Sequence, residues 1–294
     1  MRRRDALLAV LPALIWGFGF VVIKIGVENF SAPQLTALRF LVGAVPVLFV
    51  PRPRISWLQL VLIGLFLFTG QFLLLFSAFA AGLPAGLASV TQQSQVFFTV
   101  LLAAVFLRDQ PSARQTVGMV IAFSGLVLIA ATVGGDLPPL ALGLALAGAF
   151  SWAIGNILVK RLPSVPVLSL VVWASLVPPL PALLVSALED QTSLPAALAG
   201  ASWLGLGAVL YLGLLATVLG YAIWGDLLQR YPAARVAPFA LLAPCVGVVS
   251  STFLLSEVFS PLRYAGMALI LAGLAVIVLA PAGLPLVRRR RQAG

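Results

Sequence analysis

The feature that most constrains the fold is a series of ten apolar segments, each about as long as a lipid bilayer is thick. A membrane-spanning helix needs about 20 consecutive, mainly apolar residues. The chain is 62% hydrophobic and only 9% charged, whereas soluble domains have about 25% charged residues. We therefore predict an all-α integral membrane protein of ten transmembrane helices, with no soluble domain. The predicted spans are residues 6–27, 33–50, 57–80, 84–107, 113–132, 139–160, 166–187, 202–225, 233–256 and 261–281.

The basic residues test this number of spans, because cytoplasmic loops of membrane proteins are enriched in Lys and Arg. With a cytoplasmic N-terminus, ten spans place 15 of the 18 basic residues on the cytoplasmic side. The exceptions are Lys24, Arg39 and Arg263. We expect both termini to be cytoplasmic and the protein to lie in the bacterial inner membrane. The net charge of +10 then reflects topology, and no nucleic-acid partner is expected.

The two halves of the chain resemble each other. The sequence "WGFGFVVIK" (16–24) aligns with "WAIGNILVK" (152–160), and further along an offset of 148 residues pairs Asp109 with Glu257. The offset grows because the second half has the longer loop, at 188–201. Residues 1–136 and 137–294 thus hold five spans each, and an odd number inverts the second half in the membrane. Such inverted repeats are typical of alternating-access transporters, although a duplication kept only for assembly is the alternative.

These residues resemble a known family. The "WG" early in the first span, "ALRFLVGA" (37–44) in the second, and the acidic residues that close spans four and nine are similar to the drug/metabolite transporter superfamily. Its EamA-type branch, with the bacterial YddG-like exporters of aromatic and other amino acids, is the most similar. The resemblance covers essentially the whole chain. It implies export of small metabolites across the inner membrane without specifying the substrate.

A polar stretch interrupts the fourth span at "SVTQQSQVFFT" (89–99). On a helix, Ser89, Gln92, Gln95 and Thr99 share one side, whereas Gln93 points about 100° away. Amides facing lipid are costly, so this side must face protein or water. The matching stretch of the ninth span has almost no polar side chains, and this asymmetry favours a site for one asymmetric molecule. Hydrogen bonding between helices remains the alternative.

Other polar and aromatic side chains also lie well inside their spans, where an interfacial aromatic belt does not explain them. The amides would bind polar groups, and the aromatic rings would contact an apolar or aromatic side chain. A belt does account for Trp57, Trp203 and Trp224. The predicted substrate-binding residues are Trp16, Gln71, Gln92, Gln95, Trp152, Asn156 and Tyr221.

Prolines mark two of the predicted helices. Pro238 and Pro244 in the ninth span lack an N–H and free the carbonyl groups of Ala234 and Ala240, respectively. Free carbonyls accept hydrogen bonds from an ammonium group, although a simple packing kink is the alternative. The seventh span is predicted to break at Pro178, Pro179 and Pro181.

Few charges lie inside the predicted membrane region. Lys24 and Glu28 are one turn apart, which predicts a snorkelling ion pair at the outer end of the first span. Arg39 lies within the second span, where a charge costs about 2.5–3.5 kcal/mol. We expect it to have a structural role, pairing with a carbonyl group or with Glu28, although a substrate contact stays open.

The acidic residues Asp109 and Glu257 close equivalent spans and precede Ser112 and Ser260. The two serines are predicted N-caps of the following helices. For the acids we expect support of these caps, and a hinge or latch between the repeats is the alternative.

The sequence lacks the residues that nucleotide hydrolysis, most enzyme catalysis and metal binding would require. There is no phosphate-binding GxxxxGK[ST] loop, no histidine, and only one cysteine, Cys245. We therefore expect no enzyme activity, no cofactor, no metal and no ATPase subunit. Proton-coupled transporters usually carry Asp, Glu or His at mid-membrane, and none lies there, which favours facilitative transport.

The sequence thus predicts a small-metabolite exporter, with amino acids, including aromatic ones, as favoured substrates. Its partners would be the substrate and the lipid bilayer, and a monomer would suffice. A transporter of anionic metabolites, such as sugar phosphates or nucleotide sugars, would require Lys24, Arg39 or Lys160 to converge on the cavity. Proton-coupled drug or metabolite efflux is a further alternative. A non-transporting scaffold or receptor would have a dry interface between the halves.

Overall fold

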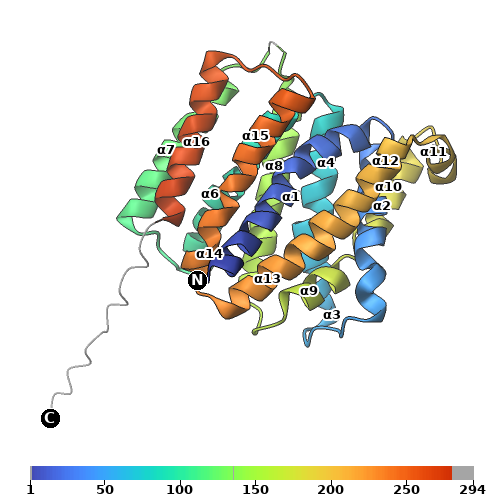
Figure 1. The fold of residues 1–294 in the computed structure, drawn as a ribbon, viewed down its shortest axis with the longest axis horizontal. Helices are drawn as coiled ribbons and strands as arrows, with labels where there is room; N and C mark the ends of the chain where they lie inside the picture. The colour runs from blue at the N-terminus through green and yellow to red at the C-terminus, as the bar shows by residue number, and fades with distance from the viewer. Residues whose placement is uncertain (1, 135, 280–294) are drawn as a thin grey trace.

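The computed structural model describes residues 2–134 and 136–279, which form a bundle of helices (Figure 1). The first repeat comprises α1 (Arg3–Val27), α2 (Ala32–Ala44), the 3-10 turn η1 (Val45–Leu48), α3 (Trp57–Ile63), the π-helix η2 (Gly64–Gly70), α4 (Gln71–Ala80), α5 (Ala85–Thr91), α6 (Ser94–Phe106) and α7 (Ala113–Ala130). The second repeat comprises α8 (Pro139–Lys160), α9 (Val167–Ala174), α10 (Pro179–Glu189), α11 (Leu194–Gly200), α12 (Trp203–Leu210), the π-helix η3 (Tyr211–Leu219), α13 (Gly220–Arg230), α14 (Ala233–Ala240), α15 (Leu242–Leu254) and α16 (Pro261–Val278). The basic residues Arg288 to Arg291 lie outside the described residues.

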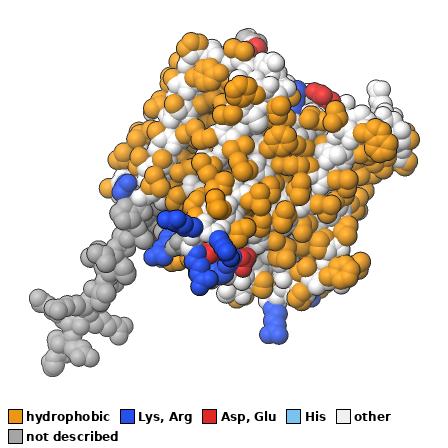
Figure 2. All heavy atoms as spheres, viewed as in Figure 1, with side chains coloured by type: hydrophobic (Ala, Val, Ile, Leu, Met, Phe, Trp, Pro, Cys, Tyr) orange, Lys and Arg blue, Asp and Glu red, His pale blue; other side chains and the backbone are white. Residues whose placement is uncertain are grey.

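Consecutive elements combine into spans of the predicted number. Over the described residues, nine helical stretches of 18 to 28 residues are long and apolar enough to cross a membrane, and Ala32–Leu48 is a shorter tenth. The all-α, ten-span prediction is confirmed. The N-terminus and the last turn of α16 lie at the same end of the bundle (Figure 1), as an even number of spans requires. Lys and Arg side chains gather mainly at that end of the face in Figure 2, although which end faces the cytoplasm stays a prediction.

Two spans are broken at equivalent positions of the repeats. The fourth is interrupted at Gln92–Gln93, between α5 and α6, and the ninth at Leu241, between α14 and α15. Pro244 explains the second break because it cannot donate to the carbonyl of Ala240, the last residue of α14. The first break has no proline and was not predicted. The predicted break of the seventh span, between α9 and α10, is confirmed.

The third and eighth spans share a feature that the sequence did not reveal. Each contains a π-helix, η2 and η3, and in each a threonine hydroxyl donates to the carbonyl five residues earlier. Thr69 Oγ1 lies 3.1 Å from the Gly64 oxygen, and Thr217 Oγ1 lies 2.8 Å from the Leu212 oxygen. Short π-helical segments are frequent at functional sites, and Leu212 and Ala216 of η3 line the cavity described below, whereas η2 directly precedes Gln71, which also lines it.

One of the contacts between the two repeats is the packing of α1 and α5 against α15; others join α7 to α16 and α4 to α8. Glycines allow this close approach. A Cβ on Gly17 would lie 2.4 Å from the Ala243 carbonyl oxygen, and one on Gly247 would lie 2.3 Å from Ser89 Cβ. Larger residues would force the backbones apart, so these small residues position the repeats.

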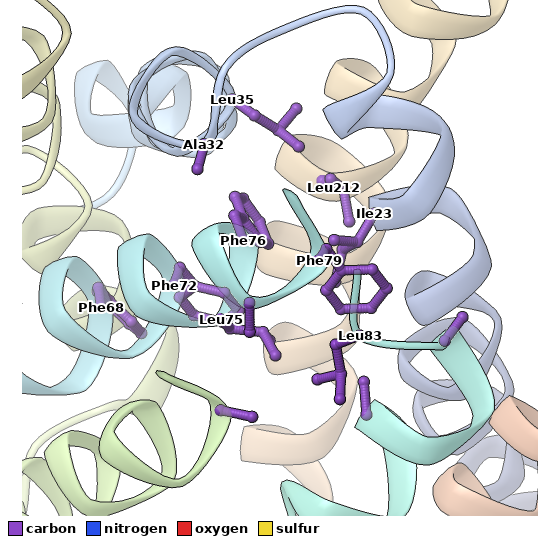
Figure 3. Packing of buried hydrophobic residues seen from close by; sticks show 14 of the residues in the cluster. Ile23, Ala32, Leu35, Phe68, Phe72, Leu75, Phe76, Phe79, Leu83 and Leu212 are labelled. Carbon is purple, nitrogen blue, oxygen red and sulfur yellow. The ribbon is translucent and has the colours of Figure 1, made fainter. Parts of the chain in front are cut away.

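The largest buried core lies around α4. Figure 3 shows the side chains of Phe72, Phe76 and Phe79 directed among residues of neighbouring elements, including Leu35 of α2 and Leu212 of η3. Phe72 also contacts Phe76, with ring centroids 5.8 Å apart. This core fixes α4, which carries Gln71 and Phe72, against elements of both repeats.

Candidate functional site

A cavity of about 280 Å³ lies between the two repeats. Residues of α1, α2, α4, α6, α8, η3, α13, α14 and α15 contribute to its wall, together with Gln92 and Gln93 at the break of the fourth span. This volume is near the lower end of the range for small-molecule pockets, about 300–1,000 Å³. The cavity therefore suits a small metabolite.

Six of the seven predicted substrate-binding residues line this cavity: Trp16, Gln71, Gln92, Gln95, Trp152 and Tyr221. The seventh, Asn156, is not among the lining residues. Its Nδ2 donates to Thr99 Oγ1 at 3.1 Å, which links α8 to α6. Asn156 thus joins two helices, contrary to the expectation that it lines the path.

Some residues of the polar stretch in the fourth span line the cavity, and others form hydrogen bonds between helices. Ser89 packs at the repeat interface, where its hydroxyl has two carbonyl oxygens within hydrogen-bond distance, those of Gly86 at 2.7 Å and Pro244 at 3.2 Å. Gln92 and Gln95 line the cavity, and so does Gln93. The expectation that Gln93 points away is wrong, because the helix is interrupted at this residue.

Two amide atoms at the cavity are buried without a hydrogen-bond partner among the described residues, Gln71 Oε1 and Gln92 Nε2. Leaving a buried polar atom unpaired costs about 1–3 kcal/mol. One of these atoms is an acceptor and the other a donor. Both atoms are covered by protein, but their side chains line the cavity, so a turn of either amide would let a bound molecule or water complete its hydrogen bonding.

Aromatic rings form another part of the wall. The Trp16 ring centroid lies 5.2 Å from that of Tyr221 and 5.6 Å from that of Trp224. The Trp16 indole N–H donates to the Ala216 carbonyl at 2.9 Å, so this group is already occupied. Trp224 was expected in an interfacial belt, but it lines the cavity. Its i, i+3 spacing from Tyr221 on one helix face was the signal that could have identified it.

Phe72 was also missed, because a phenylalanine among apolar neighbours gives no signal in the sequence. Its ring lies 6.2 Å from that of Trp152. The exposed Trp57 and Trp203, in contrast, fit the interfacial belt expected for them.

Arg39 lines the cavity and is only 4% exposed. Its Nε donates to Thr217 Oγ1 at 3.2 Å, and its guanidinium carbon lies 3.8 Å from the ring centroid of Phe72. The prediction that Arg39 pairs with a carbonyl group or with Glu28 is therefore wrong. Stacking on an aromatic ring stabilises a cation by about 0.5–2 kcal/mol, and a threonine hydroxyl is easier to reach from this depth than Glu28 near the helix end.

The other two cations considered for an anion site lie elsewhere. Lys24 is not among the cavity-lining residues, and in the described parts of the chain it has no ion pair with Glu28, contrary to expectation. Lys160 Nζ lies 2.6 Å from Asp109 Oδ2, at the end of α8. The three cations therefore do not converge.

The predicted gating acids make different contacts although they are equivalent in the repeats. Glu257 accepts from the backbone N–H groups of Ala85 and Gly86, at 2.6 and 2.9 Å, and so binds the N-terminus of α5. Asp109 instead pairs with Lys160 in a largely exposed ion pair. The two expected serine N-caps, which follow the acids in sequence, are confirmed.

Helix packing has the same asymmetry. At the Glu257 end α5 packs closely against α15, whereas in the described structure no comparable packing joins α6 to α14 at the other end. Pro238 lies inside α14, and Pro244 is buried at the start of α15. Ala240, whose carbonyl Pro244 frees, lines the cavity.

A mainly apolar cavity with a few amide groups, between two five-span repeats, is typical of a membrane transporter for small solutes. The sequence profile of the EamA-like transporter family matches residues 4–131 and 139–279, one match for each repeat. The chain belongs to this family. It is a small-metabolite exporter of the drug/metabolite transporter superfamily. Since its spans are helical and outer-membrane proteins are β-barrels, it is a multi-pass inner-membrane protein.

Individual relatives are similar over almost their full length. The "Probable amino-acid metabolite efflux pump" of Salmonella typhimurium is 43% identical over 286 residues, which cover 95% of this chain and 96% of that protein. The protein of the same name in Escherichia coli K12 is 40% identical over the same shares. A solved structure titled "Crystal structure of protein" has a TM-score of 0.63 at 20% identity, covering 95% of this chain and 99% of that one, and it supports the fold alone.

Proposed function

We propose that this protein exports amino acids, including aromatic ones, by alternating access of its two repeats. The observation that carries the proposal is the cavity wall, in which the amides of Gln71 and Gln92 lie among aromatic residues, with Gln71 Oε1 and Gln92 Nε2 unpaired in the described part of the chain. A zwitterion offers an acceptor in its carboxylate and a donor in its ammonium group. The names of the two bacterial relatives support the same substrate class.

Each wall group has a role in this proposal. Gln71 Oε1 accepts from the ammonium group, aided by the Ala240 carbonyl that Pro244 leaves free, and Gln92 Nε2 donates to the carboxylate. The rings of Trp16, Trp152 and Tyr221 contact the side chain of the substrate, where apolar and aromatic surfaces bury area against each other. Asn156 has no place in this binding set.

The unequal contacts at the two ends of the repeats support alternating access. With the N-terminal end cytoplasmic, the Glu257 contact with α5 closes the outer end, and the cavity loads from the cytoplasm. In the outward-facing state this contact breaks, and Asp109 leaves Lys160 to bind the N-terminus of α14 in the symmetric way. An exporter would exchange one acid–helix contact for the other, so that neither state is greatly favoured.

The wall also bears on the energy source. None of the described cavity-lining residues is Asp, Glu or His, so the proposal is facilitative export, and proton-coupled efflux has no carboxylate there to carry the proton. An anionic metabolite is the second candidate, because Arg39 lines the cavity. A sugar phosphate would nevertheless meet a single cation there, since Lys160 is paired with Asp109.

Flux measurements in proteoliposomes test the proposal. Vesicles loaded with a panel of amino acids should show saturable exchange that an imposed pH gradient does not change. Gln92→Leu should reduce this flux by about tenfold or more, whereas Gln191→Leu, a matched change in an exposed loop, should not. Absence of flux for every amino acid, in protein that is demonstrably folded, would refute the substrate class.

A further inference from the structure

The guanidinium group of Arg39 carries a charge that no acidic side chain in the described part of the chain neutralises. The residue is 4% exposed, and no acidic side chain within the described residues lies within 4 Å of it. Its only hydrogen bond there joins Nε to Thr217 Oγ1. A buried charge without a counter-ion is unfavourable, so an anion that enters the cavity would be attracted to it.

The orientation of this guanidinium is fixed. Thr217 Oγ1, which accepts from Nε, itself donates to the Leu212 carbonyl within the π-helix η3. The ring of Phe72 covers one face of the guanidinium at 3.8 Å. The two Nη groups have no acceptor among the described residues. They form a planar fork of N–H donors, which matches the two oxygens of a carboxylate.

The other repeat builds the same local structure without an arginine. Thr69, the repeat equivalent of Thr217, makes the same bond to the carbonyl five residues earlier without an arginine beside it. The seventh span, which is the counterpart of the second, carries no charge over residues 166–187. An element needed only for packing of the helices would be expected in both repeats. Arg39 breaks the symmetry, as a residue for one asymmetric ligand would.

We infer that Arg39 binds the substrate's carboxylate and restricts export to solutes that carry a free carboxyl group. This inference rests on the proposed function, and it revises the structural role expected for Arg39. Gln92 Nε2 then supplies a second donor for the same group, and Gln71 Oε1 accepts from the ammonium group. One cation and no anion in the described wall favour a monoanionic group over a phosphate.

The test compares one amino acid that the wild type exports with its methyl ester and its decarboxylated amine. Both analogues keep the amino group and the side chain but lack the carboxylate. The wild type should transport and bind the amino acid roughly 10- to 100-fold better than either analogue, the range expected for a hydrogen-bonded ionic group. In Arg39→Gln this preference should disappear, while Arg39→Lys, which keeps the charge without the fork, should retain part of it. Arg54→Gln, an exposed matched change, should behave as the wild type.

Binding is measured separately, as the shift in the thermal unfolding temperature that each compound causes in purified protein. If Arg39→Gln does not fold, Arg39→Lys is compared with the wild type instead. An unchanged preference for the amino acid in folded Arg39 variants would overturn the inference and leave amino-acid export intact. A wild type that neither transports nor binds any amino acid would instead refute the proposed function. In that case stabilisation by simple monocarboxylates, lost in the Arg39 variants, would still support carboxylate recognition, and its absence would overturn it.

Discussion

Removing the charge of Glu257 should open the end of the transporter that this residue closes. The carboxylate accepts two backbone N–H groups, at 2.6 and 2.9 Å, from the first turn of α5. In Glu257→Gln one oxygen remains to accept a bond, and the new NH₂ group faces backbone donors that it cannot satisfy.

The magnitude follows from these two bonds. Hydrogen bonds to a charged group contribute about 1.5–3 kcal/mol and neutral ones about 0.5–1.5 kcal/mol, and the partial exposure of Glu257 weakens its bonds. A net loss of about 1–2 kcal/mol remains, which is roughly a 5- to 30-fold change in the ratio of the two states. The change should favour the state in which α5 and α15 have separated.

Cysteine accessibility measures this ratio. Ser89 is fully buried between α5 and α15, so Ser89→Cys, in a chain whose only cysteine is replaced by Cys245→Ala, reports on their separation. With a bulky maleimide added to detergent-purified protein, the labelling rate should rise about 5- to 30-fold in Glu257→Gln. Glu28→Gln is the matched control, because this exposed acid lies at the same end of the bundle. Equal rates in all three backgrounds would refute the assignment of Glu257 as the closing contact.

Two further predictions concern stability. Gly17→Ala should lower the thermal unfolding temperature, because its Cβ would lie 2.4 Å from the Ala243 carbonyl oxygen. The loss should be equivalent to about 1–3 kcal/mol, which is typical of overpacking. Gly19→Ala is the control, since nothing lies within 4 Å of its Cβ, and it should leave this temperature unchanged. Hydrogen bonding to Arg263 lowers the pKa of Asp136, so this pair stabilises the fold above the unfolded pKa of about 3.9 and ceases to do so as the pH falls through the folded value. Asp136→Asn should therefore lower the unfolding temperature at pH 7, and its difference from the wild type should shrink below about pH 4; a difference independent of pH would contradict this assignment.

The number and order of the spans could be predicted from the sequence because both depend on properties that neighbouring residues share. Lipid solvates about 20 apolar residues at a time, so each span is visible locally. The repeat could be found from single pairs such as Asp109 and Glu257. The π-helices could not be predicted, since the hydrogen bonds of η2 and η3 span only one residue more than those of an α-helix and the two segments have no distinctive composition. The break at Gln92–Gln93 also lacks the proline that marks its counterpart.

The wall of the cavity was predictable where a side chain is costly in lipid and unpredictable where it is not. Gln71 and Gln92 are conspicuous within apolar helices, whereas Phe72 is not. The sequence does not reveal the hydrogen-bond partner of Arg39. Thr217, which binds it, is far along the chain on the other repeat. Which of two polar residues faces a cavity, as with Gln95 and Asn156, depends on packing between distant helices.

Some features of the molecule occur in both repeats and others occur only once, and we expect the two groups to have different functions. The two π-helices, the helix breaks and the acids Asp109 and Glu257 occur in both repeats, and Arg108 and Ser256, the residues before those acids, even share a positive φ of 55° and 54°. These shared features lie in the helices that would have to move, and two states of similar energy require that each half can adopt the conformation of the other. The glutamines of the fourth span and Arg39 occur once. A transported solute has no such symmetry, so the residues that bind it need not have it either. Among the polar side chains, the unpaired ones are therefore our candidates for binding the solute, and the paired acids are our candidates for opening and closing the two ends.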